Sequence, residues 1–267
     1  MKKTAVILFL ALIGSASHAQ LLRLQSPDSL NGLPKKEFYT TAWVKMNAFY
    51  DFSGIPNVSA MHLPSIPTER QGVAPDPQFH ADLNQTRVIF ATAFQTKRLG
   101  EIMSYIETDF FGNGGGGMRL RHAYARFLNF RIGQTWSGFT DEESWPNITD
   151  FDGPSTGAWV RSAQIAYFLR PTENQDIMFS VEQPSADFNR YLVIDTLIQP
   201  AKQSVPDFIS HYEIRWLKGH AQLGAVYRHI EYQNKQTQQI NFLPGWGFNV
   251  SGTQIFFERD KFTWQFA

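Results

Sequence analysis

Apolar and polar residues alternate with a period of two in short segments of the chain from Thr40 onward. In one such segment, Ile102 and Ile106 have one parity and Glu107 has the other. This alternation is typical of β-strands that present one apolar and one polar face. The pattern therefore predicts an all-β chain.

The predicted strands are joined by connections that are alternately short and long. The short joins lie near residues 96–100, 128–129, 171–176, 218–219 and 258–261. The longer stretches lie near residues 52–81, 112–117, 137–157, 183–206 and 232–244. Outer-membrane β-barrels have this rhythm because their periplasmic turns are tight and their outward loops are long. We expect a transmembrane antiparallel β-barrel with its apolar parity facing lipid, and the alternative is an exported soluble β-sandwich with the faces reversed.

The N-terminus has the features of an export signal. Lys2 and Lys3 precede an apolar stretch at residues 5–13, and small residues occupy positions 17 and 19. These features predict a signal peptide at residues 1–19. The apolar stretch is shorter than the roughly 20 residues of a spanning helix. We therefore expect a periplasmic linker at residues 20–39 and the barrel domain at residues 40–267.

Composition excludes several classes of function. The 267 residues contain 24 basic and 24 acidic side chains, so no net charge favours nucleic acid as a partner. The chain has no cysteine, which excludes disulfides and thiol chemistry. The seven histidines lack the spacing of a zinc site. We predict no cofactor, no metal site and no catalytic residue, and an outer-membrane barrel enzyme with a Ser/His pair stays as an alternative.

Six ordered segments of the chain resemble the DcaP-like outer-membrane porins. They are WVKMNAFYD (43–51), YIETDFFG (105–112), LRHAY (120–124), IGQTWS (132–137), DFDGP (150–154) and VRSAQI (160–165). The resemblance implies a homotrimer of sixteen-stranded barrels in the outer membrane of a Gram-negative bacterium. It also implies passive passage of small, mostly anionic solutes such as dicarboxylates.

Two features depart from that family. Members often carry a helical coiled-coil segment before the barrel, whereas residues 21–38 contain two prolines and an Asn31-Gly32 turn signal. Counting through the connections gives about ten strands, and residues 262–266 begin an eleventh that is too short to cross a membrane. We expect a C-terminally truncated copy of a longer porin, and a ten-stranded barrel is the alternative.

Strand parity assigns a set of charged residues to the lumen, with basic residues in excess. The basic residues are Lys45, Arg87, Arg119, Arg121, Arg131, Arg215 and Arg228, and the acidic residues are Glu107, Asp109, Glu182 and Glu213. A row of arginines offers bidentate contacts to carboxylates and lowers the cost of dehydrating an anion. The alternative is that the arginines and acids pair with each other.

The stretch at residues 137–157 joins the fifth and sixth predicted strands, where general porins fold a loop inward. It carries Asp141, Glu142, Glu143, Asp150 and Asp152. We expect these acids to form a constriction loop whose charges face the arginine wall. An ordinary acidic surface loop, with a weakly held calcium ion, is the alternative.

The parity of one strand conflicts with lipid exposure. Ile165 and Leu169 would face lipid, but the same parity directs Arg161 outward. An arginine at mid-membrane depth costs about 2–4 kcal/mol. Either Arg161 lies at the loop end of its strand, or a bulge near residues 162–163 shifts the register.

Overall fold

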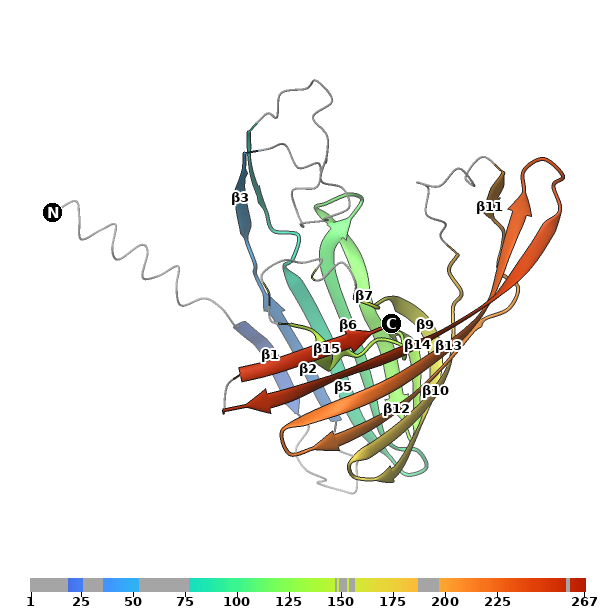
Figure 1. Cartoon of the computed structure of the whole chain (residues 1–267). Helices are drawn as coiled ribbons and strands as arrows, with labels where there is room; N and C mark the ends of the chain where they lie inside the picture. Colours follow the sequence, from blue (N-terminus) through green and yellow to red (C-terminus); the bar gives the residue numbers. More distant parts are fainter. Residues whose placement is uncertain are drawn as a thin grey trace. The chain divides into compact units, whose positions relative to one another are not determined.

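The computed structural model of the chain describes residues 19–25, 36–52, 77–146, 148, 153, 157–186, 197–257 and 260–267 (Figure 1). Antiparallel β-strands make up most of the described chain, which confirms the predicted all-β class. No helix in these ranges is long and apolar enough to span a bilayer. The chain folds as two units, residues 1–125 with 148–155 and residues 126–147 with 156–267.

The sheet of the first unit contains five strands in antiparallel order. They are, from one side to the other, β1 (Ala19–Gln25), β2 (Lys36–Trp43), β5 (Arg87–Thr96), β6 (Gly100–Gly112) and β7 (Gly117–Phe127). A separate two-stranded sheet pairs β3 (Asn47–Asp51) with β4 (Gln78–Asp82). Strand β1 begins at the last residue of the predicted signal peptide, and the rest of it and the first four residues of β2 lie in the range predicted as a linker, so regular structure begins earlier than expected.

The sheet of the second unit contains seven strands in sequence order. They are β8 (Phe130–Trp136), β9 (Arg161–Thr172), β10 (Gln175–Glu182), β12 (Asp207–Trp216), β13 (Gly219–Asn234), β14 (Ile240–Phe256) and β15 (Asp260–Phe266). The short strand β11 (Ile198–Pro200) pairs with the end of β13. One 3₁₀ turn, η2 (Glu142–Ser144), lies in the connection between β8 and β9.

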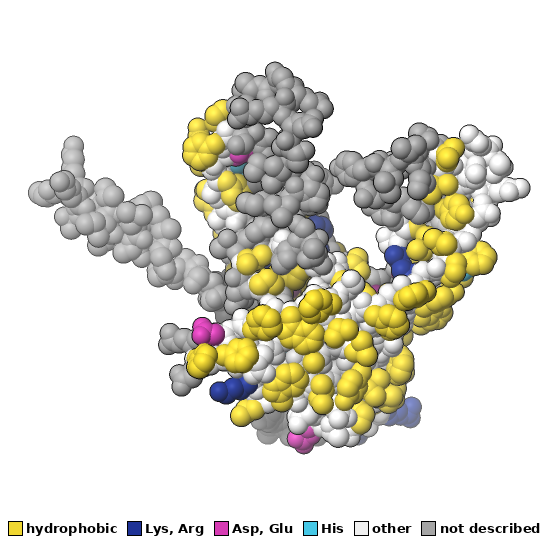
Figure 2. Space-filling model, viewed as in Figure 1, with side chains coloured by type: hydrophobic (Ala, Val, Ile, Leu, Met, Phe, Trp, Pro, Cys, Tyr) yellow, Lys and Arg dark blue, Asp and Glu magenta, His cyan; other side chains and the backbone are white. Residues whose placement is uncertain are grey.

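Burial in this fold is the reverse of that in a soluble protein. Among the described residues, twenty polar or charged residues are buried but only three apolar ones. On β14, Phe248 and Val250 are 57% and 40% exposed, whereas Asn249 and Ser251 between and beside them are fully buried. Figure 2 shows apolar side chains covering the outer face of the C-terminal strands. This pattern confirms the predicted apolar outer face and contradicts the soluble sandwich, whose apolar parity would be buried.

The short connections lie where the alternation placed them. Strands β5–β6, β7–β8, β9–β10, β12–β13 and β14–β15 are each joined by two or three residues. The predicted long stretch at residues 112–117 is wrong, because β6 and β7 are joined by only four residues. Asn113 and the three glycines that follow it all have positive φ angles, between 53° and 128°. Glycine adopts this backbone without steric cost, so the glycine run forms a tight turn rather than a long loop.

The conflict at Arg161 is resolved by its position at the strand end. Arg161 is the first residue of β9, and its guanidinium lies 4.8 Å from the ring centroid of Trp136. The β8–β9 register runs without a shift from this pair to Phe130 and Tyr167. The bulge that we considered near residues 162–163 is therefore not present in this pairing, and β9 begins with an arginine that lies over an aromatic ring.

Candidate functional site: the polar face and its docked loop

The polar face of the first unit holds a cluster of arginines around a buried carboxylate. Asp109 of β6 is fully buried and accepts two hydrogen bonds from Arg119 of β7, Nε to Oδ1 at 2.9 Å and Nη2 to Oδ2 at 2.7 Å. Arg121 donates from Nη1 to Oδ2 of Asp109 at 2.9 Å. Alternate residues of neighbouring strands point to the same face, which is why these side chains meet.

A second carboxylate extends this cluster along β6. Glu107 accepts hydrogen bonds of 2.7 Å from Arg121 Nε and from the Tyr105 hydroxyl. Arg87 Nη1 of β5 lies 3.2 Å from Glu107 Oε1. Three arginines thus share two carboxylates. In this cluster the arginines and acids of the wall pair with each other, which is the alternative that the sequence left open. The side chains of Arg87 and Arg119 remain 28% and 35% exposed.

The other predicted wall residues also have specific partners. Lys45, between β2 and β3, donates from Nζ to Gln85 Oε1. Arg131 of β8 donates to Gln164 Oε1 at 3.1 Å. Arg228 of β13 donates from Nε to Asp207 Oδ2 at 3.0 Å, and Arg215 of β12 contacts Glu213.

Residues 137–145, which we name the docked loop, cross the polar face of the second unit. Gly138 N donates to Glu182 Oε1 of β10 at 2.9 Å, and Gly138 O lies 2.8 Å from Nδ1 of His211 on β12. A Cβ atom added at Gly138 would lie 1.7 Å from Cε of the buried Met178. The loop therefore approaches the wall as closely as it does because residue 138 is glycine.

Asp141 is a buried side chain that anchors the docked loop. It is 4% exposed, and its carboxylate accepts hydrogen bonds from Ser251 Oγ on β14 at 2.7 Å and contacts His220 Nε2 on β13 at 2.9 Å. It also caps η2 by accepting from the backbone N–H groups of Glu143 and Ser144. Burial acts to raise the pKa of Asp141, but the contacts with His220 and Ser251 outweigh it and leave the pKa below its usual value.

Glu143 attaches the end of the loop to β12, β14 and β15. Its carboxylate pairs with the Arg215 guanidinium at 2.9 and 2.8 Å, and this hydrogen-bonded pair lowers the pKa of Glu143 while burial opposes the shift. Its backbone oxygen accepts from Thr253 Oγ1 of β14 at 3.0 Å and from Lys261 Nζ of β15 at 2.7 Å. The docked loop therefore contacts five strands from β10 to β15.

The docked loop lies within the stretch that we expected to form a constriction loop. Asp141 contacts His220 and Ser251 of the wall, and Glu143 pairs with Arg215, one of the predicted wall arginines. Glu142 is exposed, and Asp150 and Asp152 lie outside the described residues. The carboxylates of Asp141 and Glu143 are engaged by histidine, serine and arginine, which does not favour the calcium alternative.

Several residues that hold the docked loop are not among the site residues predicted from the sequence. They are His220, Asn249, Ser251, Thr253 and Lys261. Their parity places them on the inner face. The prediction considered only Lys, Arg, Asp and Glu as wall residues, whereas most of these side chains are neutral. The signal that could have found them is the row of Asn249, Ser251 and Thr253, which puts small polar residues between the exposed aromatic and apolar residues of β14.

The Ser251, Asp141 and His220 side chains do not form a nucleophilic relay. In such a relay the imidazole accepts the serine proton and the carboxylate orients the imidazole. Here the Ser251 hydroxyl and His220 Nε2 both contact the same carboxylate. All three side chains are nearly or fully buried, so the arrangement anchors a loop and does not support the enzyme alternative.

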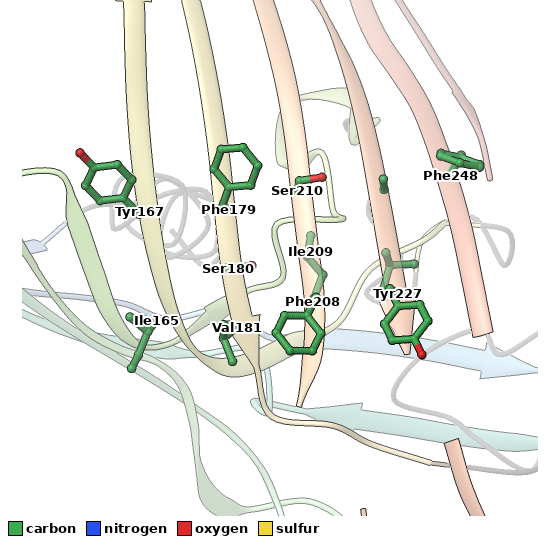
Figure 3. Close-up of a pocket in the computed structure, with 12 residues that line it drawn as sticks. Ile165, Tyr167, Phe179, Ser180, Val181, Phe208, Ile209, Ser210, Tyr227 and Phe248 are labelled. Atoms are coloured by element: carbon green, nitrogen blue, oxygen red, sulfur yellow. The ribbon is translucent and has the colours of Figure 1, made fainter. Parts of the chain in front are cut away.

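The outer face of the second unit carries an apolar groove of about 560 Å³ across β9, β10, β12, β13 and β14. Figure 3 shows Tyr167, Phe179 and Phe248 along one side of it and Val181 and Phe208 along the other. Its lining is aromatic and aliphatic with few polar atoms. The groove therefore belongs to the apolar outer surface and does not lie on a path for hydrophilic solutes.

A wall with a polar inner face, an apolar outer face and an inward-folded loop defines an outer-membrane β-barrel of the porin class. The family described as "DcaP outer membrane protein" matches residues 26–194. The chain therefore belongs to the DcaP outer membrane protein family, and it is an outer-membrane protein.

A solved structure supports the fold. The outer membrane channel DcaP of Acinetobacter baumannii matches with a TM-score of 0.64 and 21% sequence identity over 87% of this chain. The match covers 62% of the length of that channel. No curated protein sequence matches the chain.

Proposed function

We propose that the protein is a passive outer-membrane channel for small hydrophilic solutes, with a preference for anions of the dicarboxylate type. It performs no covalent chemistry. The observation that carries this proposal is the cluster in which Arg87, Arg119 and Arg121 contact Glu107 and Asp109. These five side chains carry three positive and two negative charges on the polar face of the wall.

The exposed arginines of this cluster supply the contacts that an anion needs. Arg87 and Arg119 keep about a third of their side-chain surface accessible. Guanidinium groups bind carboxylates through two parallel hydrogen bonds, and a positive wall lowers the cost of partial dehydration. Arg131 donates to the amide oxygen of Gln164 on the inner face of the second unit.

The proposal includes the assembly. We propose that residues 1–19 are removed on export and that residues 40–267 form part of a sixteen-stranded barrel in a homotrimer. The chain spans 62% of the length of the A. baumannii channel that it matches, and the described strands leave room for further strands in such a barrel.

Planar-bilayer recording tests this function. Protein in a potassium chloride gradient should give stepwise conductance. The reversal potential should be shifted from zero toward the equilibrium potential of chloride, and adding succinate should reduce the current. Replacing both Arg87 and Arg119 with glutamine should move the reversal potential toward zero. The control is Arg170→Gln, which removes an exposed pair at the β9–β10 turn. Folded protein without conductance steps, or with cation preference, would contradict the proposal.

A further inference from the structure

We propose that the docked loop is held by a proton-released latch: Asp141 fixes residues 137–145 to the inner wall, and protonation of Asp141 frees the loop and changes the width of the passage. The latch is a structural claim about the loop and wall. Its effect on passage rests on the channel function proposed above.

The geometry at Asp141 is specific for a carboxylate anion. Two of its contacts come from the backbone N–H groups of Glu143 and Ser144, which can only donate. Histidine ordinarily becomes cationic below about pH 6.5, so at the pH where a carboxylate protonates, both nitrogens of His220 are donors. A proton added to Asp141 would therefore face donors on most sides, and the buried carboxyl would lose its attraction to the imidazolium.

Charged groups surround Asp141 on several elements. Glu213 and Arg215 of β12, His220 of β13 and Lys261 of β15 come from the wall, and Glu143 belongs to the loop. His211 of β12 and Glu182 of β10 hold the start of the loop at Gly138. Protonation of Asp141 removes one negative charge from this group of side chains and ends its attraction to the His220 imidazolium.

The direction of the pH effect follows from Asp141. Its pKa lies below the usual value of 3.8 because its hydrogen bonds outweigh burial. A carboxylate with a lowered pKa stabilises the docked state fully above its usual pKa, and this stabilisation is lost as the pH falls through the lowered value. The loop should stay docked at neutral and mildly acidic pH and should be released in stronger acid.

The rate of thiol labelling in the docked loop measures whether the loop is docked, and this measurement does not depend on conductance. The chain has no cysteine, so Ser144→Cys places one thiol at a loop position that is 8% exposed. A disulfide reagent that reacts in acid should label it slowly at pH 7, and at least about tenfold faster at a pH well below 3.8. Leu217→Cys, at a position 98% exposed, corrects for the pH dependence of the reagent itself.

Three further variants in the Ser144→Cys background decide the role of Asp141. Asp141→Asn should label at the fast rate at both pH values. Ser251→Ala removes one hydrogen bond that lowers the pKa of Asp141, so its acid step should move to higher pH, and this milder change also serves if Asp141→Asn fails to fold. Glu173→Gln, in the exposed β9–β10 turn, should behave like the parent.

Two results would overturn the latch. Slow labelling of folded Asp141→Asn at pH 7 would mean that Asp141 does not hold the loop. An unchanged acid step in Asp141→Asn, or in Ser251→Ala, would assign the step to a group other than Asp141. Conductance recorded in parallel separates the two proposals, because correct labelling without any current would reject the channel and leave the latch intact.

Discussion

The inner walls of the two units use the same kind of side chain for different purposes. In the first unit, the carboxylates of Glu107 and Asp109 bind arginines on the neighbouring strands. In the second unit, the carboxylates of Glu182 and Asp141 bind a loop to the wall. An inward-facing charged side chain on a strand therefore does not necessarily contact the solute. Its partner determines whether it stabilises the wall, holds a loop or is available to a solute.

The largest expected effect tests the arginine cluster of the first unit. Asp109→Ala removes the fully buried carboxylate that Arg119 and Arg121 share. Leaving buried charges without their partner costs about 3–5 kcal/mol of unfolding free energy. Denaturant titration of the protein in lipid vesicles measures this loss.

A matched pair of charges calibrates that result. Arg23 and Glu37 pair across β1 and β2 with the arginine side chain 53% exposed, so Glu37→Gln should cost under about 1 kcal/mol. If Asp109→Ala and Glu37→Gln lose the same unfolding free energy, burial does not strengthen the Asp109 cluster, and our inference is wrong.

The second-largest expected effect concerns the apolar outer face, which both units have. Leu120 in the first unit and Phe248 in the second are 46% and 57% exposed on the outer face. Replacing either with arginine should reduce the unfolding free energy by about 2–4 kcal/mol if it lies near the middle of the bilayer. Methionine at the same two positions should be tolerated. A neutral arginine at one position alone would show that the outer faces of the units differ.

A smaller effect tests how closely the loop approaches the wall of the second unit. Gly138→Ala forces the side chain of Met178 to move, and such overpacking costs about 1–3 kcal/mol. Gly224→Ala is the control, because its Cβ would make an ordinary contact of 3.6 Å with Phe139. Similar stability of the two variants in the same titration would contradict a tightly docked loop.

The smallest effect concerns Glu143, whose side chain is 55% exposed. Glu143→Gln should cost under about 1 kcal/mol because exposed pairs are weak. Its pKa lies below the usual 4.5, so this contribution is present above that pH and is lost as the pH falls further. The stability difference between the parent and the variant should vanish in acid, and a difference that grows in acid would have the wrong sign.

Much of the fold could be predicted from alternation alone. The period of two assigns each side chain to a face, and the short connections locate the periplasmic-type turns. The glycine run at residues 114–116 was misread because its composition resembles a loop, while its positive φ angles build a tight turn. Strand β1 was missed because a turn signal and two prolines follow it within the range that we interpreted as a linker.

The partners in the site could not be predicted from the sequence. Parity places Arg119, Asp109 and Arg215 on the inner face, but strand register decides that Asp109 meets arginines and loop docking decides that Arg215 meets Glu143. Asp141 carries no sequence signal that separates an anchor from a lumenal acid. Its function as an anchor depends on His220 and Ser251, which lie about 80 and 110 residues away in the chain.

The central claim is that the polar parity of these strands faces an aqueous lumen and the apolar parity faces lipid. Nitroxide labels on single cysteines at Ile102, Met103, Ser104, Tyr105 and Ile106 of β6 test it directly, since the chain has no other thiol. We predict that labels at 102, 104 and 106 collide with lipid-soluble oxygen, and that labels at 103 and 105 collide with a water-soluble paramagnetic reagent. The reverse alternation, or none, would contradict the account.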